Sequence, residues 1–194
     1  MRRDEVTRLR AANVPAARGV VLEVGIGSGL NLPFYTRDVT KLYGVDRSRE
    51  LLTLASKEAA AAPFPVDLLN EDADRLSLAD ACVDTAVITW SLCSIANTSG
   101  ALSEVRRVLK PGGALIFVEH GLSPDAGVGK WQNRLTPCWR QCAGGCHLNR
   151  KTDDLLRDAG FTIESLRTGY VPGPRALTFM YEGRAVKIES ENRK

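Results

Sequence analysis

The sequence of 194 residues predicts one α/β domain, a three-layer sandwich in which helices cover both faces of a seven-stranded, mostly parallel sheet. Three observations predict this fold class. The length fits one domain, strand-like apolar runs alternate with helical patterns, and only a short turn separates the last two strand-like runs. Strands that alternate with helices form parallel units, whereas strands joined by a tight turn pair antiparallel. We therefore expect one antiparallel hairpin strand in the C-terminal part of the sheet.

Seven apolar runs are the expected strands. The runs at 83–89 and 114–118 are almost continuously apolar, as expected for strands that are buried on both faces, and the run at 65–69 is weaker. The full set of expected strands comprises residues 20–24, 42–45, 65–69, 83–89, 114–118, 162–171 and 178–187, and the last two are joined by Pro172-Gly-Pro174.

Helices are expected between these strands. Ser48 can cap a helix that Pro63 cannot continue and that has one apolar face, formed by Leu51, Leu52, Ala55 and Ala59. Ser99 can cap the next helix, with an inward face formed by Leu102, Val105, Val108 and Leu109. Thr152 begins a third helix, which Gly160 closes. By composition, the charged start at 1–18 and the polar tail at 188–194 are expected to be disordered.

The charge balance and the cysteine content restrict the class of function. With 26 basic and 23 acidic residues the net charge is +3, too small to indicate a surface that binds nucleic acid. The N-terminus is charged where a signal peptide needs an apolar core, and no run approaches the ~18 apolar residues of a membrane span. Five cysteines, an odd number, fit a reducing compartment. We expect a cytoplasmic protein without a nucleic-acid partner, and the oligomeric state stays open.

A glycine-rich loop follows the first expected strand and indicates a ligand. The segment Glu23-Val-Gly25-Ile-Gly27-Ser-Gly29 differs from the dinucleotide pattern G-x-G-x-x-G, and its acid would repel a pyrophosphate. The loop therefore favours a ligand that carries a positive group. Asp46 ends the second strand, where an acid can accept hydrogen bonds from both ribose hydroxyls, and Asp72-Ala73 follows the third run, where it can bind an adenine amino group.

Together these features describe a nucleoside with a cationic amino-acid tail and no phosphate, and their order resembles that of the class I S-adenosylmethionine-dependent methyltransferases. The segment Leu109-Lys-Pro-Gly-Gly113 and the C-terminal hairpin also match. The resemblance implies a Rossmann-like fold, S-adenosylmethionine as cofactor with S-adenosylhomocysteine as product, and a small-molecule methyl acceptor. It implies cofactor contacts from Glu23, Gly25, Gly27, Gly29, Asn31, Asp46, Arg47, Asp72, Ala73 and Thr89.

Over residues 20–187 the chain looks like a narrower group, the small methyltransferase-like proteins whose animal members are thiol S-methyltransferases, together with their bacterial relatives. Three segments carry this resemblance: Trp90-Ser-Leu-Cys-Ser-Ile95, Phe117-Val-Glu-His-Gly121 and Gly144-Gly-Cys-His-Leu-Asn-Arg150. The animal proteins begin with a membrane-anchoring segment that has no counterpart here, so we expect no stable membrane anchor. The resemblance implies methyl transfer to a thiol or a sulfide.

Methyl transfer from a sulfonium is an in-line displacement, which needs an aligned nucleophile in a dry pocket. His120 is a candidate base or substrate orienter, with a structural histidine as the alternative. Glu119 is a candidate catalytic acid, with pairing to a helix terminus as the alternative; the two need not touch, because neighbours on a strand point to opposite faces. His147 is a second candidate base, and the candidate substrate contacts are Trp90, Cys93, Trp131 and Cys146.

Residues 122–152 form a candidate substrate lid. Its part from 126 to 152 holds five basic residues, three cysteines, two tryptophans and no acid. Trp131, Leu135 and Trp139 are spaced by four, so they could instead form the buried stripe of a helix.

The cysteines of this segment, Cys138, Cys142 and Cys146, also recur every four residues. Zinc sites usually show a two-residue gap, and Gly144-Gly145 should end any helix before Cys146. No metal site is therefore expected.

Two other functions stay open. In an N-methyltransferase that acts on a small amine or a phospholipid headgroup, Glu119 would orient the nitrogen and the basic lid would attract a phosphate. In a cofactor-binding module without turnover, the pocket would bind the cofactor and methylate no acceptor.

Overall fold

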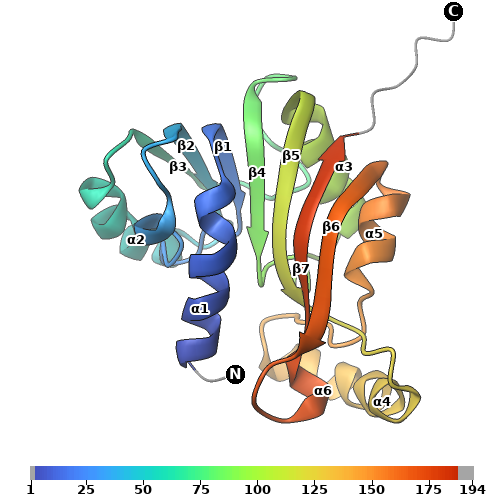
Figure 1. The fold of residues 1–194 in the computed structure, drawn as a ribbon. Coiled ribbons are helices and arrows are strands. Elements are labelled where there is room, and N and C mark those ends of the chain that lie inside the picture. The colour runs from blue at the N-terminus through green and yellow to red at the C-terminus, as the bar shows by residue number, and fades with distance from the viewer. Residues whose placement is uncertain (1–2, 188–194) are drawn as a thin grey trace, which may run out of the picture.

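A seven-stranded sheet forms the centre of the molecule in the computed structural model, which describes residues 3–187 (Figure 1). The strand order is β3-β2-β1-β4-β5-β7-β6. The first five strands are parallel, and β7 lies antiparallel between β5 and β6. The predicted fold class is thus confirmed, whereas the polar tail predicted at 188–194 lies outside the described residues.

The observed strands match the seven predicted runs with small shifts at their ends. They are β1 (Gly19–Val24), β2 (Val39–Val45), β3 (Val66–Leu69), β4 (Val83–Thr89), β5 (Leu109–His120), β6 (Phe161–Tyr170) and β7 (Phe179–Lys187). The largest difference is at β5, which begins five residues earlier than predicted. Leu109 already pairs with Val83, and an irregularity that contains Gly112 at φ +71° then shifts the register.

The helices are α1 (Arg3–Asn13), α2 (Arg49–Ala61), α3 (Thr98–Val108), α4 (Ala126–Cys142), α5 (Thr152–Asp158) and α6 (Arg175–Thr178), with short 3-10 turns at Val14–Ala16 and Leu32–Phe34. The predicted cap of α2 is confirmed, because the Ser48 side chain accepts a hydrogen bond from Leu51 N. The predicted Ser99 cap is wrong. Asn97 caps α3 instead, accepting from Gly100 N at 3.0 Å, so the helix begins one residue before Ser99.

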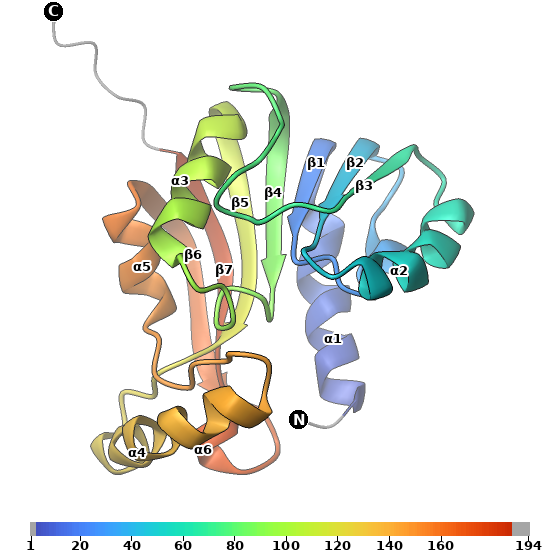
Figure 2. The ribbon, with the colours of Figure 1, turned by 180° about the vertical axis from the view of Figure 1, so that it is seen from behind.

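Two apolar cores lie on opposite faces of the sheet, because side chains alternate along each buried strand. On β1, Val21 packs with Leu52 of α2, whereas Leu22 packs with Val105 of α3 and Leu156 of α5. Helices α3 and α5 cover the face seen in Figure 2, and α1 covers part of the face seen in Figure 1. Because β1 to β5 are parallel, their carboxyl ends all lie at the same edge of the sheet.

The charged start of the chain is folded, contrary to the expectation from composition. Residues 3–16 form α1 and the following turn, and they bury Leu9 and Val14. Leu9 packs with Val118, Val171 and Met180, so this helix is attached to both the centre and the C-terminal hairpin of the sheet. Composition is a poor guide here because a few apolar residues are enough to anchor one short helix.

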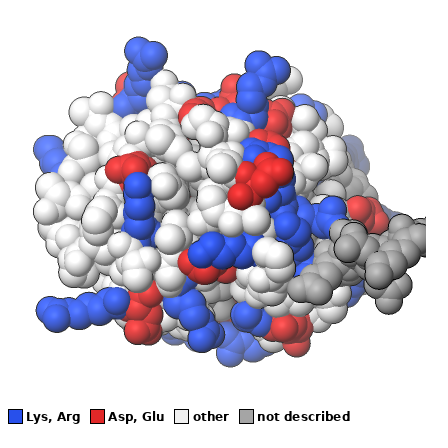
Figure 3. Space-filling view, turned by 90° about the horizontal axis from the view of Figure 1, so that it is seen from above, with Lys and Arg blue, Asp and Glu red and all other residues white. Residues whose placement is uncertain are grey.

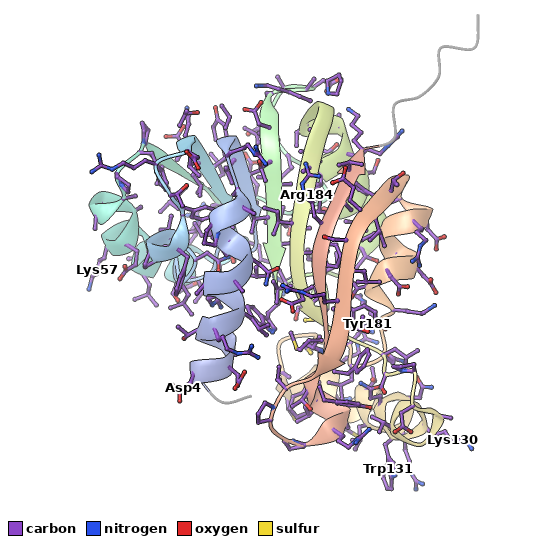
Figure 4. All side chains as sticks on the ribbon, viewed as in Figure 1. Asp4, Lys57, Lys130, Trp131, Tyr181 and Arg184 are labelled. Atoms are coloured by element: carbon purple, nitrogen blue, oxygen red, sulfur yellow. The ribbon has the colours of Figure 1, made fainter. Side chains whose placement is uncertain are left out.

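The predicted buried stripe of α4 is wrong. Trp131 is 59% exposed and Leu135 40% exposed, and Figure 4 shows Trp131 pointing away from the body of the molecule beside Lys130. The buried face instead carries Gln132, whose amide nitrogen donates to Gly121 O and Ala176 O while its oxygen accepts from Ser123 N. A hydrogen-bonded polar side chain therefore attaches this helix, which apolar periodicity cannot reveal.

The charged residues are distributed in mixed groups. On the face opposite the carboxyl ends of the parallel strands, Lys and Arg alternate with Asp and Glu, as Figure 3 shows. Within residues 3–187 there is no helix whose length and apolar character would let it cross a membrane.

Candidate active site

A pocket of about 640 Å³ opens at the carboxyl ends of the parallel strands. Its walls come from the loop after β1, the ends of β2 and β4, the segments 71–74 and 94–97, the helix α1 and the loop after α4. Ligands of open α/β sheets bind at this edge. Eight of the ten predicted cofactor contacts line this pocket: Glu23, Gly25, Gly27, Asp46, Arg47, Asp72, Ala73 and Thr89.

The glycine loop adopts a backbone that side chains would disturb. Gly25 has φ +71°, and a Cβ there would lie 2.2 Å from Ser91 Oγ. Gly27 has φ +57°, and a Cβ there would meet no protein atom within 4 Å, because the residue faces the open pocket. The loop is thus packed tightly against the end of β4 on one side and free to approach a ligand on the other.

The carboxylate of Glu23 is buried behind this loop and is only 1% exposed. It accepts hydrogen bonds of 2.8 Å from Asn31 Nδ2 and from Tyr35 OH. Burial raises the pKa of Glu23 to about 7, an effect that these two hydrogen bonds and the nearby Arg10 oppose. A cation in the pocket would favour the ionised form further, so this carboxyl is adapted to a positively charged ligand.

Two predicted cofactor contacts do not line the pocket. Asn31 is 1% exposed and bridges Glu23, Thr89 and Arg10 through its amide. Gly29 has φ +82° and packs against Leu32 and α2. Both residues support the loop from the side away from the pocket. They therefore shape the pocket without lining it.

Asp46 joins the glycine loop to the start of α2. Its two carboxylate oxygens accept from Gly27 N at 3.0 Å and from Ser48 N at 2.9 Å. Each oxygen has the capacity to accept a further hydrogen bond, as binding of a ribose diol requires. Asp72 and Ala73 lie on the wall after β3, where the sequence places an adenine contact.

Arg10 is a wall residue that sequence reasoning missed. Its guanidinium lies 4.8 Å from the centroid of the Trp90 ring and donates to Asn31 Oδ1 at 2.5 Å. The residue comes from the N-terminal helix, so α1 closes one side of the pocket. The periodicity of α1 carries a weak signal, because Leu9 is its one large buried apolar residue.

Trp90 occupies a strained position directly after β4. Its φ is +49°, a conformation that costs free energy for a side chain of this size. Its indole Nε1–H is buried without a hydrogen-bond partner among the described residues. Such a strained residue with an orphaned donor on a pocket wall is typical of a functional site.

Glu119 and Arg150 hold the loop that follows Trp90 from two sides. The Glu119 carboxylate accepts from the backbone N–H groups of Ser91 and Leu92 at 2.7 and 2.9 Å, and more weakly from Cys93 N. The Arg150 guanidinium donates to the carbonyls of Leu92 and Ile95. Glu119 is 1% exposed and is not a lining residue, so the structure places this predicted catalytic acid beneath the loop rather than in the pocket.

His120 points to the other side of β5, toward two cysteines. Its Nε2 lies 3.0 Å from Cys146 Sγ, which also accepts from Trp139 Nε1 at 3.3 Å. Hydrogen bonds from Cys93 and His120 lower the pKa of Cys146. The pKa of Cys93 is raised instead, because its thiol is hydrogen-bonded to Cys146 and is buried. Cys146 therefore ionises more readily than Cys93.

Besides Glu119, five of the predicted catalytic and substrate residues lie outside the pocket wall, whereas Trp90 lines it. His120, Cys93 and Cys146 are buried away from the pocket, and Trp131 lies on the solvent side of α4. His147 is half-buried, and its backbone N–H donates to Cys93 O at 2.9 Å. Burial and the nearby Arg150 and Arg140 lower the pKa of His147. Of the candidate lid, residues 122–152, Gly144 alone lines the pocket.

The pocket fits a nucleoside with a cationic tail. Carboxylates stand where hydroxyl and amino donors would bind, a glycine opens directly onto the cavity, and Glu23 is adapted to a positive group. A phosphate would meet these carboxylates rather than a helix N-terminus. The residues present therefore match S-adenosylmethionine, and Asp46, Asp72 and the glycine loop are the groups that would hold it.

Comparison with known proteins agrees with this geometry. Residues 22–117 match a family model described as a methyltransferase domain. Thiol S-methyltransferase TMT1B of Homo sapiens is 32% identical over 164 residues, 83% of this chain and 67% of that protein. A phosphatidylethanolamine N-methyltransferase of Cereibacter sphaeroides is 36% identical over 115 residues, 58% of this chain and 56% of that protein.

The fold is also found among solved structures. A crystal structure of a methyltransferase from Methanosarcina mazei, described as SAM-dependent, superimposes with a TM-score of 0.71 at 23% identity, over 88% of this chain and 93% of that one. The chain therefore belongs to the class I S-adenosylmethionine-dependent methyltransferases, and S-adenosylmethionine is its cofactor.

Proposed function

We propose that this enzyme methylates the sulfur of a small thiol or sulfide. The observation that carries the proposal is the 32% identity to a thiol S-methyltransferase over 83% of the chain. The three segments that suggest this acceptor from the sequence, 90–95, 117–121 and 144–150, come from distant parts of the chain and meet beside one wall of the pocket.

The charge and the surface of this wall suit a thiolate. The bound cofactor supplies a methyl group on a sulfonium, and the acceptor must present its electron pair in a site without water. Trp90 and Ile95 provide apolar surface, and Arg10 provides a positive charge in the same pocket. A guanidinium attracts an anionic sulfur more strongly than a neutral amine, because only the thiolate gains Coulomb energy.

The chemistry needs little more from the protein than alignment. A free thiol with a pKa near 8.5 is already a few per cent thiolate at pH 7 and is strongly nucleophilic in that form. Since no histidine is among the described residues that line the pocket, we assign the proton to solvent. His120 and Glu119 then act as positioning residues that fix the loop 90–97.

The test is a panel of acceptors with isotopically labelled cofactor. Sulfide, alkyl thiols, small amines and phosphatidylethanolamine vesicles are each incubated with the enzyme, and the labelled product is identified by mass spectrometry. The expected result is label on sulfide or thiols, at a rate that rises with pH up to the thiol pKa. Label on amines with none on any thiol would refute the proposal. Gly27→Ala, whose Cβ enters the pocket, is the control with weakened cofactor binding, and Cys138→Ser on the exposed side of α4 is the control with full activity.

A second candidate is an N-methyltransferase acting on a phospholipid headgroup. The similarity to the phosphatidylethanolamine N-methyltransferase favours it, as do the basic residues Lys130 and Arg134 beside the exposed Trp131. Against it, Glu119, the acid predicted to orient the nitrogen, has its carboxylate occupied by backbone N–H groups outside the pocket. Vesicles in the same panel decide between the two.

A further inference from the structure

A second cluster of reactive side chains lies behind the pocket wall. Cys93 from the loop after β4, His120 at the end of β5 and Cys146 from the loop after α4 direct two sulfurs and one imidazole nitrogen toward one another. The three ligand atoms lie within 4.8 Å of each other, and the residues are only 4%, 8% and 8% exposed. Methyl transfer as derived above uses none of the three as a contact to cofactor or acceptor.

The spacing of these atoms is close to that of a metal site. In tetrahedral coordination with bonds of about 2.3 Å to sulfur and about 2.0 Å to nitrogen, neighbouring ligand atoms are roughly 3.5–3.8 Å apart. His120 Nε2 and Cys146 Sγ are 3.0 Å apart, so seating an ion requires them to separate by roughly half an ångström.

The surroundings of the cluster also suit a ligating thiolate. Trp139 Nε1–H, which donates to Cys146 Sγ, is the kind of outer hydrogen bond that orients a ligating thiolate.

We propose that Cys93, His120 and Cys146 form a binding site for one thiophilic divalent cation of the Zn²⁺ class, with a fourth position left for water or another exogenous ligand. Sulfur and imidazole are the donors that such ions prefer, and a set of two cysteines and one histidine leaves a tetrahedral ion one open position. The site is assembled from residues far apart in the sequence, so the ion would join the loop 90–97 to the loop after α4, both of which form the pocket wall. It does not depend on which acceptor the enzyme methylates.

Cobalt and zinc titrations test the proposal on the intact, reduced enzyme. After treatment with a chelator, Co²⁺ should bind at one equivalent and give a thiolate-to-metal charge-transfer band together with the visible bands of a four-coordinate ion, and Zn²⁺ should displace it. Cys93→Ser, Cys146→Ser and His120→Asn should each abolish these bands. Cys138→Ser combined with Cys142→Ser should keep them, because both of these cysteines are exposed.

A measurement on the unmodified chain guards against variants that fail to fold. Cys93 and Cys146 should be alkylated more slowly with Zn²⁺ than with a chelator, while the rates of Cys138 and Cys142 stay the same, and mass spectrometry of tryptic peptides reads out all four. The proposal is overturned if the wild type shows no thiolate-to-cobalt band. It is equally overturned if Zn²⁺ protects the exposed cysteines and leaves the buried pair unprotected. Neither readout involves methyl transfer, so failure here and failure of the proposed function are distinguishable.

Discussion

Replacing Glu23 with glutamine should remove most of the pH dependence that the pocket imposes on stability. The carboxyl is 1% exposed, and burial raises its pKa from the ordinary 4.5 to about 7. The folded protein therefore holds a proton that the unfolded chain has released between these two values. Since stability rises with pH only where the unfolded state binds more protons, Glu23 lowers the free energy of unfolding as pH rises through this window.

The size of the effect follows from the two pKa values. Integration of the linkage relation from pH 5 to pH 8 gives a loss of about 2.5 kcal/mol in the free energy of unfolding from this one group. Glutamine is neutral throughout and can still accept from Asn31 while Tyr35 rotates its hydroxyl to accept from the amide. The variant should therefore lack this loss.

Urea unfolding of both proteins without cofactor, at several pH values from 5 to 8, measures the difference. Titrations elsewhere in the chain cancel when the two profiles are subtracted. The expected difference changes by about 2.5 kcal/mol across the range, in favour of the variant at high pH. Two parallel profiles would refute the reasoning, because they would mean that Glu23 is ionised in the folded state at pH 5.

Four further substitutions test the walls of the pocket and the attachment of α4. Arg10→Ala should raise the Kd of the cofactor roughly tenfold, because it removes the cation over Trp90 and the support of Asn31; an unchanged Kd by calorimetry would mean that α1 is only a cover. Gly27→Ala should weaken cofactor binding at least as much, since its Cβ enters the open pocket, and should cost about 1–2 kcal/mol of stability, since its φ is +57°; equal affinity would show that the cofactor does not approach this residue. Gln132→Ala should cost about 2 kcal/mol or more because it leaves three backbone groups unpaired, whereas Trp131→Ala should change stability by less than about 0.5 kcal/mol. If urea unfolding shows a larger loss of stability for Trp131→Ala than for Gln132→Ala, the buried face of α4 is the one that the spacing of Trp131, Leu135 and Trp139 suggests.

The sheet and the cofactor side of the pocket were predictable because they depend on local signals. Apolar runs mark the strands, and Gly25, Gly27, Asp46 and Asp72 occupy fixed places after successive strands, so topology alone brings them together. A residue's place in this part of the site follows from its place in the sequence.

The acceptor side was less predictable, because it depends on contacts between distant segments. Arg10 reaches the pocket only because Leu9 packs α1 against the sheet, and composition favoured disorder for that stretch. His120 meets Cys146 across 26 residues, a pairing that no local period encodes. The spacing of Trp131, Leu135 and Trp139 indicated a buried face, but hydrogen bonds from Gln132 turn that face to solvent.

Glu119 illustrates how a motif can mark a residue without fixing its role. Its carboxylate is essential to the geometry after β4, because it satisfies backbone N–H groups of a loop that has no regular structure. A motif of the sequence shows that a residue matters but does not distinguish contact with the substrate from support of the wall. Only the direction of the side chain makes that distinction.

The helix α1 has a practical consequence for how the enzyme is produced. It begins at Arg3, and Arg10 reaches the pocket about 10 Å further along the helix. A purification tag or fusion partner placed before Arg3 would therefore start within two helical turns of the entrance and compete for the same space. Kinetic constants for cofactor and acceptor should be measured with the N-terminal tag removed. The end of β7 lies at the opposite edge of the sheet, as Figure 1 shows, and is the better place to attach a handle.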